Sequence, residues 1–252
     1  MKSLFFGSVS RRVALIGALA LLVMSALLPT TAFAASNEKQ PVCAANNVKC
    51  VITYGDTIIV KRQKALNTLN DKVTTALSNH EITSAQASVL QTDIAAAQSN
   101  LTNYKKKMDA EKSETSARQD ITNLWTKLRI YAVVLPRDYR TLEFDYEVNA
   151  ETLMQNISPV IQAGLTLVST NQQSQLNPLY SDYSKQIANA QPQIQIAQGA
   201  LPAFTVANYN QHYRSFQTSK STLDKALQQA SDALFKASDD LKQMARILGI
   251  SG

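Results

Sequence analysis

The chain has 252 residues, with 25 Lys and Arg against 19 Asp and Glu, and a formal net charge of +6 at pH 7. Three of those six charges lie in an N-terminal segment of 34 residues that we expect to be removed, so the mature chain of 218 residues would carry +3. A net charge this small gives no support to an anionic surface as a partner, and no nucleic-acid partner is expected. Charged residues make up 17% of the chain, while 21 Gln and 16 Asn supply much of its polarity.

Residues 1–34 have the organisation of a secretory signal peptide. Three basic residues precede the apolar run Val13–Leu28, and Ala32-Phe33-Ala34 supplies a small-x-small cleavage site. The run is shorter than the roughly 20 apolar residues that span a bilayer, so cleavage after Ala34 or Ala35 is favoured over a retained anchor. The twin-arginine motif is incomplete, which favours the general secretion route. The mature protein is therefore expected to be secreted or at the cell surface, with no integral membrane span.

Two cysteines, Cys43 and Cys50, lie in residues 35–54, which we expect to form a weakly ordered lead-in. In an exported chain this spacing favours a local disulfide that closes a small loop. Free thiols remain an alternative. A metal site is disfavoured, because it would need at least two further ligands and the chain offers only His80 and His212, far apart in sequence.

Apolar residues recur at alternating steps of three and four along five segments of the mature chain. This spacing places each set on one side of a helix, as in the seams of coiled coils and bundles. Glycine and proline are few, seven each, which argues against an all-β fold. The five segments are Leu66–Val73, Ala87–Met108, Ile121–Leu135, Tyr180–Leu201 and Leu223–Leu248.

Capping signals predict where four of the helices begin. Asp56 is expected to cap the first helix, which would run to about Ser78. Thr83–Gln86 and Ser116–Gln119 have the spacing of capping boxes, and are expected to open the second and third helices. Asn177–Pro178 has the pattern of a cap followed by proline at the first helical position, and is expected to open the next helix.

Prolines and glycines predict the remaining irregularities. Pro136 is expected to kink the third helix and Pro192 the one that follows Asn177–Pro178. Residues 142–170 are expected to be helical with a less regular seam, and residues 199–210 to form a loop. The last helix would have about 35 residues and end near Gly249.

Together these elements predict an all-α fold. We expect residues 55–252 to form one domain, an elongated antiparallel up-and-down bundle of about five helices with coiled-coil-like seams. The connections are short, which makes sequence neighbours antiparallel. Because several seams in one chain can cover each other, a monomer is favoured over a coiled-coil rod that dimerises.

The segment Leu124–Pro136 holds the sole tryptophan and comes closest to being apolar on every side. Such a helix is normally buried on every side, so a kinked core helix is the favoured interpretation. The alternative is an exposed patch that binds a partner helix or lipid, whereas insertion across a membrane is disfavoured by the short run. The residues of this possible interaction patch are Trp125, Ile130, Tyr131, Val134 and Leu135.

Glu143, Glu147 and Glu151 follow one another at steps of four, which places them on one face of a helix. Carboxylate oxygens suit calcium or magnesium, so a divalent-ion site is one interpretation. A face that is solvated or paired with Lys and Arg is favoured, and we predict no metal site. A di-iron bundle would need Glu-x-x-His pairs, which the sequence lacks.

Motifs of catalysis are missing from the sequence. It contains no GxSxG elbow, HExxH pair, phosphate loop or dinucleotide fingerprint. Each cysteine lies outside the predicted bundle, and the two histidines have no nucleophile at a recognisable spacing. We therefore expect neither an enzymatic activity nor a cofactor.

The chain resembles a loose group of exported bacterial helical-bundle proteins of unknown function in two stretches, GDTIIVKRQKALNTLNDKV (Gly55–Val73) and LRIYAVVLPRDY (Leu128–Tyr139). The resemblance implies an exported helical protein and carries no activity or functional residue with it. We expect a non-catalytic bundle that mediates interactions with an unknown protein or cell-envelope component at or beyond the cell surface. The alternative is a binder of an apolar ligand or membrane surface through Leu124–Pro136.

Overall fold

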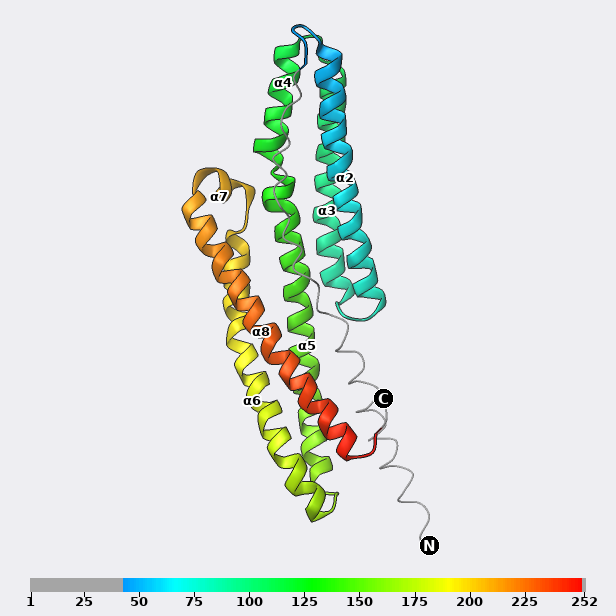
Figure 1. Ribbon diagram of the computed structural model, residues 1–252, viewed down its shortest axis with the longest axis vertical. Coiled ribbons are helices and arrows are strands. Elements are labelled where there is room, and N and C mark those ends of the chain that lie inside the picture. Colours follow the sequence, from blue (N-terminus) through cyan, green and yellow to red (C-terminus); the bar gives the residue numbers. More distant parts are fainter. Residues whose placement is uncertain (1–42, 251–252) are drawn as a thin grey trace. The chain divides into compact units, whose positions relative to one another are not determined.

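The computed structural model describes residues 43–250 (Figure 1). The predicted signal peptide, residues 1–34, lies outside them, as does the beginning of the predicted lead-in. Of the described residues 88% are helical and none lies in a β-strand, so the predicted all-α fold is confirmed. Within residues 43–250, no helix combines the length and the apolar character needed to cross a membrane.

Five long helices of 26 to 35 residues account for most of the structure, in agreement with the predicted number. Two shorter helices are α4 (Glu114–Asn123) and α7 (Val206–Gln211). The π-helical turns η2 (Leu124–Leu128) and η3 (Ile130–Val134) lie between α4 and α5, and a 3-10 turn, η4 (Leu201–Ala203), follows α6. The long helices are α2 (Val48–Ser78), α3 (Ser84–Asp109), α5 (Leu135–Leu165), α6 (Thr170–Ala200) and α8 (Tyr213–Ile247).

The described residues form two compact units, and the single helical domain expected over residues 55–252 stays a prediction. Unit 2 consists of residues 43–142 and 200–221, and unit 1 of residues 143–199 and 222–250. Helices α5 and α8 contribute residues to both units. Helices of 31 and 35 residues are long enough to pack against different partners along their length.

In unit 2, α2 and α3 lie side by side as an antiparallel pair (Figure 1). The Gln98 amide donates to Asn67 Oδ1 at 2.6 Å. Lys105 Nζ lies 2.6 Å from Asp56 Oδ1, so residue numbers rise along one helix as they fall along the other. Buried side chains in these two helices follow the predicted seams, among them Leu66, Leu69, Val73, Ala87, Leu90, Ile94 and Leu101.

The first helix begins earlier than predicted. It starts at Val48, and its cap is Asn47, whose side chain accepts a hydrogen bond from the backbone N–H three residues further on. The expected cap lay directly after Gly55, which was interpreted as a boundary. Gly55 is instead buried inside α2, where the Met108 side chain of α3 occupies the space that a Cβ atom would need. Residues 48–54, expected to be weakly ordered, are therefore helical.

The predicted start of α3 is confirmed, and that of α4 is wrong. The Gln86 N–H donates to Thr83 Oγ1, and the Thr83 N–H donates to Gln86 Oε1, which completes the predicted capping box. Helix α4 is capped by Ser113, whose hydroxyl accepts a hydrogen bond from the Ser116 N–H at 3.1 Å. The predicted cap, Ser116, is thus already inside the first turn.

Helix α6 begins at Thr170, well before its predicted start. The Gln172 N–H donates to Ser169 Oγ, and the Ser169 N–H donates to Gln172 Oε1, so these two residues satisfy each other at the helix start. The predicted cap, Asn177–Pro178, lies inside the helix. The capping-box spacing of Ser169 and Gln172 is present in the sequence, but the prediction rested on the Asn-Pro pattern alone.

Unit 1 is built from its portions of α5, α6 and α8. The Tyr183 hydroxyl donates to the Met154 carbonyl at 2.6 Å, and the hydroxyls of Tyr180 and Ser158 lie 3.0 Å apart, so α5 and α6 are antiparallel. The buried residues of this core are Met154, Ile157, Ile161, Leu176, Tyr183, Ile187, Ala190, Ile194, Ala230, Ala233, Leu234, Ala237, Leu241 and Met244.

The last helix has the predicted length and end. Gly249 adopts a left-handed backbone, with φ of 70°, which glycine tolerates. The Ile250 N–H donates to the Ala245 carbonyl at 2.9 Å, and the Gly249 N–H donates to the Arg246 carbonyl at 3.1 Å, as in a Schellman motif. The loop expected over residues 199–210 is mostly helical. The end of α6, the turn η4 and the first residues of α7 occupy most of it.

Candidate functional site

The path from α4 to α5 is interrupted at Arg129, not at Pro136 as predicted. Arg129 has left-handed backbone angles, φ 46° and ψ 37°, which are rare for a residue with a side chain. A π-helical turn lies on each side of it. Pro136 is the second residue of α5, which continues directly from the π-helical turn η3. Such a backbone is retained only where the surrounding structure holds it, so we expect Arg129 to be fixed by its contacts.

Residues of α7 hold the Arg129 side chain. Its guanidinium carbon lies 4.7 Å from the centroid of the Tyr209 ring, and its Nε donates to Asn210 Oδ1 at 3.0 Å. The Asn210 amide nitrogen donates in turn to the Thr126 carbonyl in η2 at 2.9 Å. We call Arg129, Tyr209 and Asn210 the clasp, because they join α7 to the interrupted helix.

A small apolar cluster fixes the segment around α7 against η3. Its buried residues are Val133, Phe204 and Phe216. The ring centroids of Phe204 and Phe216 are 4.6 Å apart, and Tyr209 meets Phe216 edge-on at 5.0 Å. The clasp thus stands on a packed support within unit 2, although nothing in the sequence pattern of residues 199–210 had indicated one.

The residues of the predicted interaction patch are divided between core and surface. Ile130 and Leu135 are buried, whereas Trp125, Tyr131 and Val134 are only half-buried. The Tyr131 ring lies beneath a guanidinium group from α2, whose carbon is 4.9 Å from the ring centroid. The segment therefore does not present one continuous apolar face.

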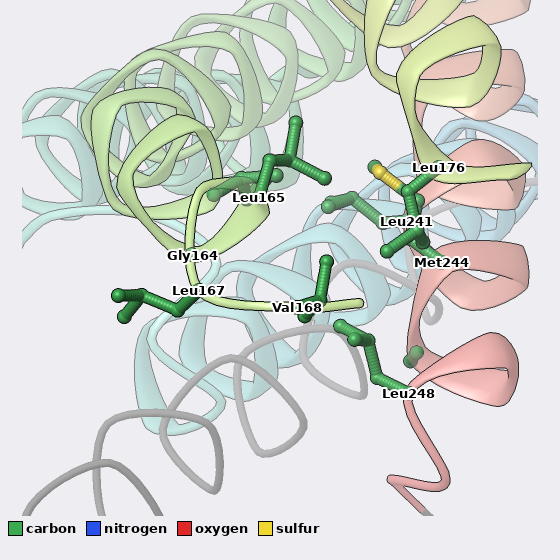
Figure 2. Close-up of a pocket in the computed structure, with 10 residues that line it drawn as sticks. Gly164, Leu165, Leu167, Val168, Leu176, Leu241, Met244 and Leu248 are labelled. Carbon is green, nitrogen blue, oxygen red and sulfur yellow. The ribbon is translucent and has the colours of Figure 1, made fainter. Parts of the chain in front are cut away.

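Unit 1 contains a cavity of about 110 Å³ where the connection between α5 and α6 meets the end of α8 (Figure 2). In Figure 2, Leu165 and Val168 lie on one side of it and Met244 on the other, while Leu167 points away. All ten lining residues are apolar: Ile161, Gly164, Leu165, Leu167, Val168, Leu176, Leu241, Met244, Ala245 and Leu248.

The local sequence explains why space is left at this point. Gly164 lies at the end of α5 and carries no side chain, and a Cβ atom there would meet no other atom within 4 Å. Leu167 is 71% exposed, so it does not fill the space. Sequence reasoning missed this cavity, because it depends on how three chain segments meet. The available signal was a glycine among Leu165, Leu167 and Val168 at a helix end.

The three glutamates of the predicted acidic face have different surroundings. Glu147 is buried, and burial raises its pKa to about 7. The Ser231 hydroxyl opposes this shift through a hydrogen bond, while the charges of Glu143 and Asp232 add to it. Glu151 is half-buried, and burial raises its pKa as well. Among residues 43–250, no three His, Cys, Asp or Glu side chains are grouped so that they could hold a metal ion.

Cys43 and Cys50 are joined by a disulfide, with Cα atoms 5.8 Å apart. The loop that it closes leads into the first turn of α2. The Asn46 N–H in this loop donates to a carboxylate oxygen of Glu114 at 2.7 Å, which links the loop to the start of α4. The disulfide therefore belongs to the packing of unit 2.

No protein-family model matches this chain, and neither the curated proteins nor the solved structures contain a detectable relative. The resemblance to exported bacterial helical proteins therefore stays a prediction. What the protein binds has to be inferred from its cavity, its clasp and the distribution of its charges.

Proposed function

We propose that this protein is an exported, non-catalytic binding protein and that unit 1 takes up a small apolar molecule in its cavity. The signal-peptide pattern of residues 1–34 supports export, and with it an action at or beyond the cell surface. The several seams within one chain support a monomer. The observation that carries the binding activity is the lining of the cavity, in which all ten residues are apolar.

The lining decides which ligands this cavity would accept. A polar or charged molecule would lose its hydrogen bonds to water and gain none from these side chains. An apolar molecule gains roughly 25 cal/mol for each Å² of surface removed from water. An engineered apolar cavity of roughly 150 Å³ binds benzene, so a space of about 110 Å³ suits a small ring or a short alkyl segment.

In the alternative drawn from the sequence, the segment Leu124–Pro136 binds an apolar ligand or a membrane surface. In that segment, Ile130 and Leu135 are buried in unit 2 and are not available to a ligand. The cavity of unit 1 has unfilled volume, which a binding site for a small molecule requires. We therefore assign the activity to the cavity.

Benzene is a suitable probe, because its binding can be followed at the methionine methyl groups. The mature chain contains three methionines, each in a different environment. Met244 lines the cavity, Met154 lies elsewhere in the core of unit 1, and Met108 belongs to unit 2. With ¹³C-methyl-labelled methionine, we expect benzene to shift the Met244 methyl resonance saturably while the other two change little. Equal, non-saturating shifts of all three resonances would indicate solvent-like partitioning and would contradict the proposal.

Two glycines provide a matched pair of variants. Gly164 lines the cavity and Gly199 does not, yet both lie near a helix end and a Cβ atom at either meets nothing within 4 Å. We expect Gly164→Leu to fill the cavity and weaken benzene binding at least about tenfold. Gly199→Leu should leave the affinity unchanged. If both variants bind benzene like the unsubstituted protein, the ligand does not occupy this cavity.

A further inference from the structure

The two units carry opposite charge. The described residues of unit 2 contain sixteen Lys and Arg against nine Asp and Glu, whereas those of unit 1 contain five against nine. The small net charge of the mature chain is therefore an average over a basic and an acidic unit. Unit 2 by itself is basic enough to attract an anionic partner.

The acidic residues of unit 2 are mostly engaged in ion pairs. Six of the nine pair with cations of the same unit: Asp56 and Asp109 with Lys105, Asp120 with Lys107, Glu114 with Arg118, and Asp93 and Asp138 with Arg137. The excess positive charge therefore remains on other side chains. Around the clasp the excess is local, because residues 121–136 and 200–221 contain no Asp or Glu at all.

Three cations lie in these two segments close to the clasp. Lys127 belongs to η2, which α7 contacts, and Arg129 is the clasp arginine. Arg214 follows Tyr213, whose ring meets the Tyr209 ring edge-on at 5.1 Å. Lys127 and Arg214 are exposed, and Arg129 is partly so. None of the three forms an ion pair with an acidic residue among those described.

The Arg129 guanidinium is held in place before any partner arrives. Its backbone conformation, the Tyr209 ring and the Asn210 side chain together fix its position. A guanidinium has five N–H groups, and the clasp uses only the one on Nε. The two terminal nitrogens can then bind a carboxylate through two parallel hydrogen bonds. A group that is already immobilised loses less entropy on binding.

We propose that Lys127, Arg129, Tyr209, Tyr213 and Arg214 form a docking surface for an acidic segment of a partner protein. Charge complementarity favours an anionic partner, and the planar guanidinium favours carboxylates. Tyrosine and arginine are enriched where protein partners bind most strongly, and Tyr213 is 53% exposed. This surface lies in unit 2, so it does not depend on the cavity of unit 1.

The test measures binding of a fluorescent decaglutamate peptide to the mature protein at low salt, with decaglutamine as the uncharged control. Arg129→Gly removes the guanidinium and relieves the left-handed backbone, so the variant should stay folded. We expect it to weaken decaglutamate binding at least tenfold. Lys112→Gln removes one exposed charge of unit 2 away from the clasp and should change the affinity less than threefold.

Two further measurements separate the clasp from general attraction to a basic surface. Asn210→Ala frees the Arg129 side chain and leaves all charges in place, and we expect it to weaken binding about threefold or more. Polyphosphate of matched charge should bind less tightly than decaglutamate and depend less on Arg129. Equal weakening by Arg129→Gly and Lys112→Gln, or tighter binding of polyphosphate, would overturn the proposal. Neither result would bear on benzene binding in unit 1.

Discussion

The two units differ in where their helices are interrupted. In unit 1, Pro159, Pro178 and Pro192 all lie inside long helices that continue past them. In unit 2, the helical path is broken at Arg129, which is not a helix breaker. All three prolines are exposed, so the carbonyl that loses its partner can turn to water. Packing and solvent access therefore decide where a helix ends, and residue type alone does not.

The units also differ in how they handle a buried carboxyl. In unit 2, Asp138 lies beside Arg137, whose charge partly offsets the effect of burial, and its pKa is raised to about 6. In unit 1, Glu147 has the Ser231 hydroxyl as the group that favours its ionised form, and its pKa is raised to about 7. Both carboxyls are thus easier to protonate in the folded protein than in the unfolded chain.

The largest effect is expected from a charge buried at the start of α5. Leu135 is fully buried at the start of α5, so Leu135→Asp should lower the free energy of unfolding by about 4 kcal/mol or more. Urea titrations followed by circular dichroism would measure the loss. The Met108 methyl resonance should lose its native position at lower urea than that of Met154, because Met108 belongs to unit 2.

The control for this variant is Val60→Asp in α2. Val60 is 58% exposed in the same unit, so a charge there should change the free energy of unfolding by less than about 0.5 kcal/mol. A Leu135→Asp protein with an unchanged urea midpoint would show that this residue does not belong to the core of unit 2.

The pH should change the free energy of unfolding by up to about 3 kcal/mol through the buried carboxyl of Glu147. The pKa of Glu147 is raised from 4.5 to about 7, so between these values the folded state binds more protons than the unfolded state. The free energy of unfolding should therefore fall as the pH rises from 4.5 to 7 and level off above. Asp138 acts with the same sign, but only up to about pH 6.

Between pH 6 and 8, the free energy of unfolding should therefore change through Glu147 in unit 1 and no longer through Asp138 in unit 2. Glu147→Gln should abolish the decline there, because the amide cannot ionise. Asp71→Asn removes an exposed negative charge from α2 and should retain the decline. If the decline persists in Glu147→Gln, another group of the folded protein is responsible for it.

Much of the fold follows from spacing, which is a local property of the sequence. Steps of three and four located the buried residues of α2, α3, α6 and α8, and the Thr83 capping box and the Gly249 end were also predictable. Those features depend on residues within one or two helical turns of each other. The division into two units does not, because it depends on which helix a given stretch of α5 or α8 packs against.

The candidate sites were less predictable for the same reason. Arginine has no preference for left-handed backbone, and its conformation at position 129 depends on contacts with residues about 80 positions away. The cavity arises where three segments meet around a missing side chain at Gly164. The segment Leu124–Pro136 was singled out correctly as unusual, but its break was attributed to the proline because proline is the commoner cause.

The smallest effect should reverse its sign between the units. A Cβ atom at Gly55 would overlap the Sδ and Cε atoms of the buried Met108 side chain, so Gly55→Ala should lower the free energy of unfolding by about 1 kcal/mol. Gly199→Ala should raise it by about 0.5 kcal/mol, because alanine favours a helix and nothing obstructs its methyl group. In a Met108→Ala background the overlap disappears, so Gly55→Ala should then be neutral or stabilising. Urea midpoints of the three single variants and of the Gly55→Ala, Met108→Ala double variant test this. Equal stabilisation by both glycine substitutions would mean that the Met108 side chain moves aside at no cost and that α2 and α3 do not need a glycine where they meet.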